Sequence, residues 1–179
     1  VTEPLMFNPG FGNYDHTLSA YVVEQVAIIP ISGTLVHKGA WLGSYSGMTS
    51  YEGISEQLSR AMDSNLIETV VLNMHSFGGE VAGLFDLCDE IQAASKLKPV
   101  IALVSDFAAS ACYAIAASCS KIVMTQTAQV GSVGVVMTHT DASKFYEEKG
   151  LKFTHIFAGR DKIRGTHIKP LSEADKEHF

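Results

Sequence analysis

The sequence predicts a mixed α/β fold for three reasons. Short apolar runs rich in Val and Ile alternate along the chain with segments whose apolar residues recur at helical spacing. Clusters of Gly, Ser and Pro separate these segments, as turns and loops do. The chain has 179 residues, 46% of them hydrophobic, which suits one domain with a sizeable core.

The N-terminal part is predicted to hold an arm, a strand and a loop. Residues 1–20 mix Pro, Gly and polar residues without periodicity, which indicates an irregular arm. The run 26–31 predicts a strand, and Pro30 indicates that it lies near a sheet edge or a strand end. The glycines and serines of 37–48 are typical of a loop.

A helix and a buried strand follow. Thr49 and Glu52 have the spacing of a capping box, which predicts that a helix starts there. The apolar face of this helix would carry Ile54, Leu58, Ala61 and Met62. A buried strand is predicted at 69–74, and it would end in the turn Ser76-Phe77-Gly78-Gly79.

The C-terminal half continues the alternation. Apolar residues at helical spacing predict a helix after the turn, with the face Val81, Leu84, Phe85, Cys88 and Ile91. The remaining predicted elements are a strand at 100–104, a helical segment at 108–119, short strands at 122–124 and 133–137, a helix at 141–149 stopped by Gly150, a strand at 151–157 and a helix from Ser172 with Asp175 three residues on.

Charge and composition exclude several classes of protein. The 13 Lys and Arg against 19 Asp and Glu give a net charge of −6, which argues against a nucleic-acid or anionic-membrane partner. No apolar stretch approaches the ~20 residues that span a bilayer. Cys88, Cys112 and Cys119 lie in apolar segments and are predicted to be reduced core residues. The chain opens at Val1 without a signal peptide, so we expect its natural start to be missing.

Familiar signatures of cofactor and metal enzymes do not occur. The sequence has no G-x-G-x-x-G, no phosphate-binding G-x-x-x-x-G-K-[ST], no H-E-x-x-H and no G-x-S-x-G. The seven histidines show no metal-ligand spacing. We therefore expect neither a cofactor nor a metal.

Two predicted strand-to-helix junctions could carry chemistry. At the first, Gly78 and Gly79 would turn the backbone tightly and expose N–H groups suited to a developing oxyanion. At the second, small residues around Ser110 would leave its hydroxyl at a helix start with room for a substrate carbonyl. The residues alone leave open a plain turn at the first junction and a capping serine at the second.

Three motifs occur in a fixed order: Ser76-Phe-Gly-Gly79, Asp106-Phe-Ala-Ala-Ser-Ala111 and Gly131-Ser-Val-Gly-Val135. Together they resemble the signal peptide peptidase A family of serine peptidases (S49). Further segments resemble its phage-encoded branch, the head protease that processes scaffold during capsid maturation: Glu3–Met6, Pro30–Val36, Tyr45–Thr49, Thr125–Ala128 and Gly159–Lys162. The resemblance covers nearly all of the chain.

The resemblance implies a crotonase/Clp protease-like fold of repeated β-β-α units. It implies one peptidase domain at 21–179 behind the arm at 1–20. Members of the family run on past this point, so we expect the chain to be truncated in the helix that starts at Ser172.

The same resemblance implies the site residues. Ser110 would be the nucleophile of a Ser/Lys dyad and Lys162 its general base, with Ser132 orienting the lysine by a hydrogen bond. Gly78 and the N–H of Ala111 match the oxyanion-hole donors, with Gly79 beside them. Two residues depart from the family's pattern: Phe77 replaces the usual proline, and Cys112 stands where glycine is common.

A lysine acts as a base only when burial or like charge lowers its pKa. Arg160 and Arg164 flank Lys162 and would supply like charge, while Asp161 would oppose them. Desolvation when substrate fills the groove is the expected main cause. Whether the two arginines tune Lys162 or contact substrate stays open.

The expected function is therefore a serine endopeptidase that processes phage scaffold and capsid proteins during head maturation. Its partners would be protein substrates and further copies of the chain in a ring-like homo-oligomer, in the host cytoplasm or the procapsid. One alternative is degradation of remnant signal peptides in a membrane-associated setting. Others are a non-catalytic capsid-assembly module and an acyl-CoA hydratase or isomerase on the same fold, with Glu80 as base.

Overall fold

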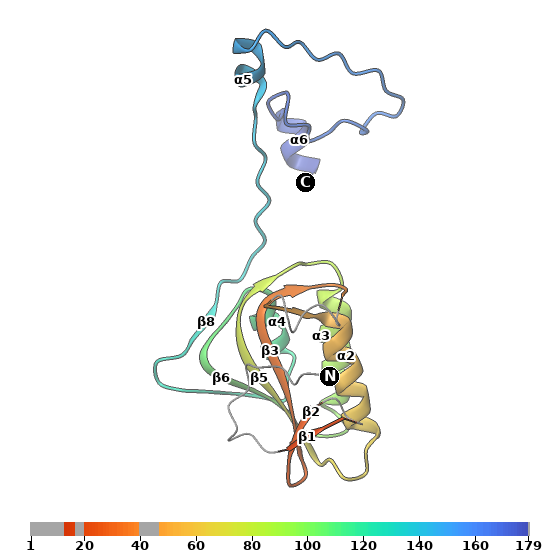
Figure 1. The fold of residues 1–179 in the computed structure, drawn as a ribbon, viewed down its shortest axis with the longest axis vertical. Helices are drawn as coiled ribbons and strands as arrows, with labels where there is room; N and C mark the ends of the chain where they lie inside the picture. Colours follow the sequence, from red (N-terminus) through yellow and green to blue (C-terminus); the bar gives the residue numbers. More distant parts are fainter. Residues whose placement is uncertain (1–12, 17–19, 40–46, 179) are drawn as a thin grey trace. The chain divides into compact units, whose positions relative to one another are not determined.

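The computed structural model describes residues 13–16, 20–39 and 47–178 (Figure 1). The chain divides into two compact units, Val1–Val135 and Val136–Phe179. The prediction of one peptidase domain over 21–179 stays a prediction.

The first unit is built on an eight-stranded sheet with the order β1-β2-β3-β5-β6-β7, in which β4 pairs with β3 and β8 with β6. The strands are β1 (Asn13–Asp15), β2 (Ala20–Val23), β3 (Val26–Val36), β4 (Met48–Ser50), β5 (Thr69–Gly79), β6 (Val100–Ala109), β7 (Lys121–Met124) and β8 (Gln129–Gly131). The pairs β1–β2 and β2–β3 are antiparallel, and all other pairs are parallel. Helices connect the parallel strands, which confirms the predicted α/β class.

The long strands change register once along their length. The pairing of β3 with β5 shifts between Ser32 and Thr34, and that of β5 with β6 shifts between Met74 and Ser76. Each long strand therefore consists of two segments, and a helix follows: α3 (Leu84–Ala94) after β5, and α4 (Ala111–Ala117) after β6. This arrangement agrees with the repeated β-β-α units that the resemblance implies.

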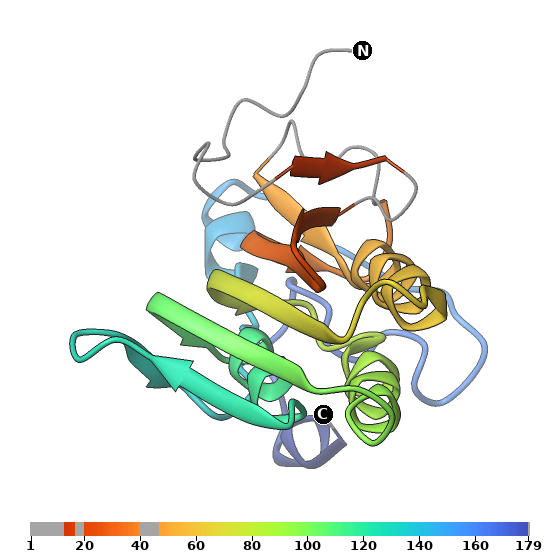
Figure 2. The same cartoon turned by 90° about the horizontal axis from the view of Figure 1, so that it is seen from below.

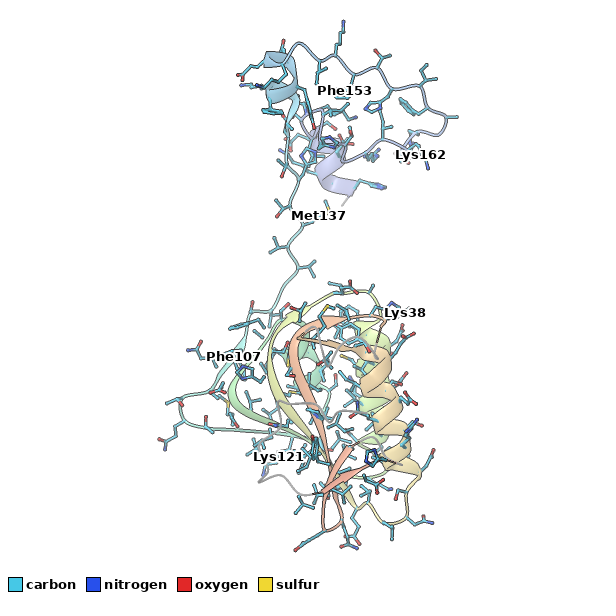
Figure 3. The ribbon with its side chains drawn as sticks, viewed as in Figure 1. Lys38, Phe107, Lys121, Met137, Phe153 and Lys162 are labelled. Atoms are coloured by element: carbon cyan, nitrogen blue, oxygen red, sulfur yellow. The ribbon has the colours of Figure 1, made fainter. Side chains whose placement is uncertain are left out.

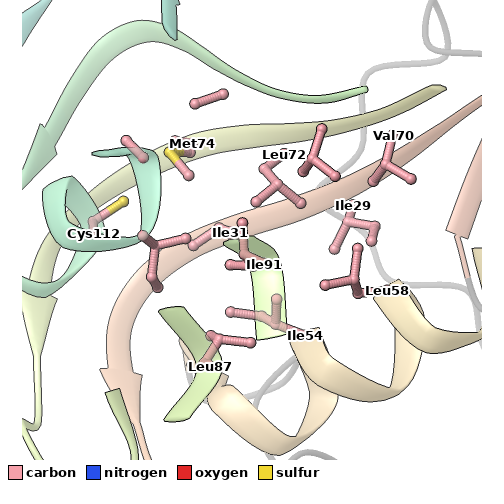
Figure 4. Close-up of a cluster of buried hydrophobic side chains, with 14 of the residues drawn as sticks. Ile29, Ile31, Ile54, Leu58, Val70, Leu72, Met74, Leu87, Ile91 and Cys112 are labelled. Atoms are coloured by element: carbon pink, nitrogen blue, oxygen red, sulfur yellow. The ribbon is translucent and has the colours of Figure 1, made fainter. Parts of the chain in front are cut away.

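The core lies between the sheet and the helices α2 (Tyr51–Asp63), α3 and α4 (Figures 1 and 2). Alternate residues of β5, among them Leu72 and Met74, are buried against these helices. Figure 4 shows Ile54 and Leu58 of α2 and Ile91 of α3 pointing at the same cluster. Burial of this apolar surface is what holds the parallel strands in place.

Two predictions for the N-terminal half change, and the one for Pro30 agrees with the structure. Residues 13–15 form β1, although the whole of 1–20 was expected to be an irregular arm. Residues 1–12 and 17–19 of that arm lie outside the described chain. Residues 48–50 form β4, although 37–48 was predicted to be a loop, of which 40–46 is also outside the description. Pro30 lies inside β3, but between the β2 and β4 pairings, so its flank is a local edge.

The predicted capping box is also wrong. Ser50 is the N-cap of α2, and its side chain accepts a hydrogen bond from the Gly53 N–H. Thr49 Oγ1 instead donates to the Ser32 carbonyl (2.7 Å) and accepts from the Ser32 N–H (3.2 Å). Thr49 is thus hydrogen-bonded to β3 where the strand shifts its register, a long-range contact that local spacing could not show.

Both strands before the junctions run further than predicted. β5 continues through Gly79 and β6 through Ala109, so α3 and α4 begin later than the periodicity suggested. The predicted face of α3 is buried at Leu84, Cys88 and Ile91, whereas Val81 and Phe85 are exposed. A strand was not recognised beyond residue 74 because polar residues and glycines pair there through backbone alone.

The second unit holds two short helices, α5 (Ser143–Glu148) and α6 (Glu173–His178). Both were predicted, and the start of α6 is capped as expected, because the Asp175 N–H donates to Ser172 Oγ (3.2 Å). The segments 133–137 and 151–157 are not strands, although β7 at 121–124 is. An apolar pattern says which side chains suit a sheet, but not whether a neighbouring strand is present.

Candidate active site

Ser110 lies at the sharp junction between β6 and α4. Its backbone has φ 52° and ψ −122°, a conformation that L-residues rarely adopt. The Ser110 N–H donates to the Gly131 carbonyl (2.8 Å), and the Ser110 carbonyl accepts from the Ala114 N–H (3.0 Å). Hydrogen bonds on both sides thus hold the strained residue.

The half-buried side chain of Ser110 makes no capping hydrogen bond to α4. This contrasts with Ser50, whose hydroxyl caps α2. Of the two interpretations that the sequence left open, the structure therefore supports a serine at a helix start whose hydroxyl does not serve as the cap.

Gly78 packs directly against this junction. A methyl group built on Gly78 would lie 2.8 Å from Ser110 Cβ, 2.9 Å from the Ala109 carbonyl oxygen and 3.0 Å from the Ala111 nitrogen. Gly78 also has a φ of +104°, which only glycine adopts readily. β5 can therefore approach the backbone around Ser110 only because residue 78 has no side chain.

The N–H groups of the two glycines point to opposite sides of β5. The Gly78 N–H donates to Ser76 Oγ (3.0 Å), and the Glu80 N–H donates to the Leu35 carbonyl of β3 (2.9 Å). Because successive N–H groups of an extended strand alternate, the Gly79 N–H is directed away from β3, to the flank where β6 lies. Their roles as oxyanion donors, with Ala111, stay predictions.

The glycine pair does not stand at a helix N-terminus. The residue before α3 is Gly83, four positions after Gly79, and the helix itself starts at Leu84. The partial positive charge of a helix N-terminus therefore contributes nothing at Gly78. Any donor function of the glycines comes from the strand conformation alone.

Ser132 follows β8 directly and is exposed, with φ 55°. The pairing of Ala109 with Gly131 brings β8 alongside β6, so the carbonyl just before Ser132 is the one that accepts from the Ser110 N–H. The structure thus brings the Gly131–Ser132 segment to Ser110. The role of Ser132 toward Lys162 stays a prediction.

Lys162 belongs to the second unit, where it lies in a turn with its side chain exposed (Figure 3). Its neighbour Arg164 is bound by carboxylates, at 2.6 Å from Asp161 and 3.4 Å from Asp175. Arg160 also lies 3.6 Å from Asp161. The positive charge of both arginines is therefore partly neutralised within their own unit, which weakens their predicted effect on Lys162.

Glu80 is already engaged. Its carboxylate accepts from the His37 N–H (2.7 Å), and its carbonyl accepts from the Tyr51 hydroxyl (2.5 Å). A base for hydratase chemistry needs a free carboxylate near the substrate. These contacts argue against that alternative.

Cys112 is buried two residues after Ser110, among the core side chains of Figure 4. Burial raises the pKa of its thiol to about 12, although a hydrogen bond with Ser76 lowers it in part. The thiol is thus protonated near neutral pH and is not a second nucleophile. Cys88 and Cys119 are free thiols as well, as predicted.

Hollows occur in the described part of the chain. One of about 440 Å³ lies in the second unit between Tyr146 and Phe153, and one of about 220 Å³ lies around His37 and Gly83. Ser110 lines neither of them. Within the described ranges no helix has the length and apolar character of a membrane span, and no cluster of His, Cys, Asp and Glu suits a metal.

Comparison with known proteins shows which family the chain resembles. The model of peptidase family S49 matches residues 92–179. The chain is 39% identical over 150 residues to the head-tail preconnector protein GP5 of Enterobacteria phage P21, over 84% of this chain and 30% of that protein. It is 38% identical over 159 residues to the capsid assembly protease C of Escherichia phage lambda, over 89% and 36% of the two chains. The chain is a relative of the S49 peptidases.

The predicted resemblance to family S49 and its phage-encoded branch is thereby confirmed. The S49 match includes Ser110, Ser132 and Lys162, while Gly78 and Gly79 precede it. The present chain spans 30% of the length of the P21 protein and 36% of that of the lambda protein.

A solved structure supports the fold. A mutant of the 1510-N membrane-bound stomatin-specific protease has a TM-score of 0.51 at 17% identity, over 67% of this chain and 53% of that chain. Identity this low shows the shared fold alone.

The sequence did not reveal the part played by Ser76. Its hydroxyl is buried and bonded to the backbone of both β3 and β5. A serine two residues before a glycine is a signal for a side-chain-to-backbone turn, so the bond to Gly78 could have been anticipated. The bond to Gly33 could not, because it depends on the pairing of distant strands.

Proposed function

We propose that this chain is the catalytic part of a serine endopeptidase with Ser110 as its nucleophile. The observation that carries the proposal is the strained junction at Ser110, against which the backbone of Gly78 packs closely, next to the Ala111 nitrogen. A strained serine between a strand and a helix presents its hydroxyl outward, next to backbone donors, in other hydrolases as well. The relatedness to S49 peptidases supports the same chemistry.

In the proposed mechanism the Ser110 hydroxyl attacks the carbonyl carbon of the scissile peptide bond, and its proton passes to the neutral amine of Lys162. Backbone N–H groups at Ala111 and at Gly79, beside Gly78, stabilise the negative charge on the carbonyl oxygen. The proton then moves from Lys162 to the departing amine. Water hydrolyses the acyl-enzyme by the same steps, and Ser132 keeps the lysine oriented.

The proposed substrates are scaffold and capsid proteins during phage head maturation. The names of the two phage relatives, a capsid assembly protease and a head-tail preconnector, support this choice. The proposal includes self-association of the chain and a location in the host cytoplasm or the procapsid. Sedimentation velocity of the purified chain tests self-association, which a monomer at all concentrations would contradict.

Cleavage of an unstructured protein tests the chemistry. Casein is incubated with the parent chain, Ser110→Ala and Lys162→Ala, and products are identified by mass spectrometry. Two matched controls are Ser95→Ala, whose hydroxyl is buried without a partner among the described residues, and Lys152→Ala, an exposed lysine of the same unit as Lys162. We expect cleavage by the parent and both controls only.

Equal cleavage by Ser110→Ala would refute the nucleophile, and equal cleavage by Lys162→Ala would refute the dyad. Substrate class is tested by offering a phage scaffold protein beside a synthetic signal peptide. Preferential cleavage of the scaffold supports head maturation. Preferential cleavage of the signal peptide favours the alternative, and cleavage of neither by a folded chain favours a non-catalytic assembly module.

A further inference from the structure

The hydroxyl of Ser76 joins two strands at the candidate site. The Ser76 side chain is 1% exposed. Its Oγ donates to the Gly33 carbonyl of β3 (2.6 Å) and accepts from the Gly78 N–H of its own strand (3.0 Å). A hydroxyl with both bonds made in a buried place has one orientation, so it fixes the groups that it joins.

Besides the Cys112 thiol, the two backbone partners of Ser76 are glycines in places where no side chain fits. Gly33 has φ +71°, and a methyl group there would lie 1.9 Å from the Gly47 carbonyl oxygen. That same oxygen accepts from the Thr34 N–H (3.1 Å). Glycine restricts its own backbone least of all residues, so neither segment keeps its conformation by local preference. The hydroxyl supplies the constraint that the two glycines lack.

The peptide between Phe77 and Gly78 is the group whose orientation matters most. Its N–H is held toward β3 by Ser76, and the next N–H, that of Gly79, is thereby directed to the opposite flank, toward β6. Gly78 also pairs with Thr34 of β3, but the Ser76 hydroxyl is the side-chain acceptor of its N–H. Loss of the hydroxyl would leave this peptide held by strand pairing alone, so the orientation of the N–H groups that face the Ser110 junction would be less well fixed.

We propose that Ser76 is a positioning residue that fixes which backbone N–H groups of β5 face Ser110. The inference rests on the proposed function, because the orientation of these groups matters for catalysis only if Ser110 is the nucleophile. Preorganised donors act on the transition state more than on bound substrate. Loss of the hydroxyl should therefore lower kcat and leave KM nearly unchanged.

A fluorophosphonate probe tests the inference on the intact chain. Ser110 Oγ forms a bond to phosphorus, the P–F bond breaks, and fluoride and the hydroxyl proton leave; the phosphoryl oxygen takes the place of the oxyanion. The labelling rate is measured for the parent, Ser76→Ala, Ser76→Thr and Ser118→Ala. Ser118 is a matched control, because it is also buried and its hydroxyl donates to the Ala114 carbonyl (2.9 Å).

We expect Ser76→Ala to be labelled about 10- to 100-fold more slowly than the parent, since misorienting a donor costs no more than deleting it. Ser76→Thr should restore most of the rate, and Ser118→Ala should match the parent. Hydrogen exchange of the Gly78 amide gives a second readout that does not depend on activity. It should be faster in Ser76→Ala than in the parent at equal global stability.

The outcomes separate the two proposals. An unlabelled parent would contradict the proposed function, and the inference with it. A labelled parent with equal labelling of Ser76→Ala would overturn the inference alone. Equal slowing in Ser118→Ala would assign the effect to a loosened core and would also overturn it.

Discussion

Gly78 and Ser110 approach so closely that a single methyl group on Gly78 would lie 2.8 Å from Ser110 Cβ. Real Cβ atoms do not come that near to one another. The same methyl group would also lie 2.9 Å from the Ala109 carbonyl oxygen, so a small shift would not relieve the clash. The glycine motif and the serine motif, far apart in the sequence, therefore form one site through their backbones.

Gly78→Ala should lose more free energy of unfolding than Gly39→Ala, in which only the backbone conformation is strained. Gly39 provides the matched control, because it has the same φ of +104° and no atom of the described residues lies within 4 Å of a built methyl group. We expect about 1–3 kcal/mol of strain in both variants and about 1–3 kcal/mol of overpacking in Gly78→Ala only. Urea denaturation measures the difference, and equal losses would contradict the close packing.

Lys98→Met should destabilise the fold by about 2 kcal/mol, since hydrogen bonds to charged groups contribute that much. Lys98 Nζ donates to the carbonyls of Ala61, Met62 and Ser64 at the end of α2, at 3.2, 2.8 and 2.8 Å. Methionine keeps the apolar stem and removes the charge. Lys96→Met, at an exposed position, should change the unfolding midpoint little, and a similar loss there would count against the helix-end contacts.

Cys112 should make stability fall at alkaline pH. The pKa of its thiol is about 12 in the folded chain and near its ordinary 9.0 when unfolded. Below about pH 9 both states hold the proton; between about pH 9 and 12 only the folded state does, so the free energy of unfolding falls by up to about 1.4 kcal/mol per pH unit. Cys112→Ala removes this contribution, while those of Cys119 and Tyr51, whose pKa values are also raised to about 12, remain. Its deficit relative to the parent, measured by urea unfolding, should shrink as the pH rises, and a constant deficit would refute the shift.

Phe77 and Phe107 should stabilise each other although Phe77 is 72% exposed. Their rings stack with centroids 3.9 Å apart at 19°. A double-mutant cycle with Phe77→Ala and Phe107→Ala should give a coupling of about 0.5–1 kcal/mol. The pair Phe77 and Phe85, with no recorded ring contact in the described chain, should be additive. A coupling near zero for Phe77 and Phe107 would contradict the stack.

Local patterns predicted those elements whose burial follows one period. The spacing of Ile54 and Leu58 gave α2, and the run 69–74 gave most of β5, because each periodicity matches a buried face. The same rule failed at 133–137 and 151–157, where apolar residues are present but no strand pairs with them. Ser50 replaced Thr49 as the cap of α2 because Thr49 is bonded to Ser32 of another strand.

The amino-acid sequence by itself determined the α/β class, the S49 relationship and the placing of Ser110 after a buried strand, since each depends on residues close together in the chain or on motifs in order. Only the tertiary structure decided that Gly78 lies against Ser110, that its N–H is held by Ser76, and that β8 brings Gly131 to the Ser110 N–H. These contacts join segments whose pairing depends on strand register. Register is set by burial of the whole sheet face and not by any single segment.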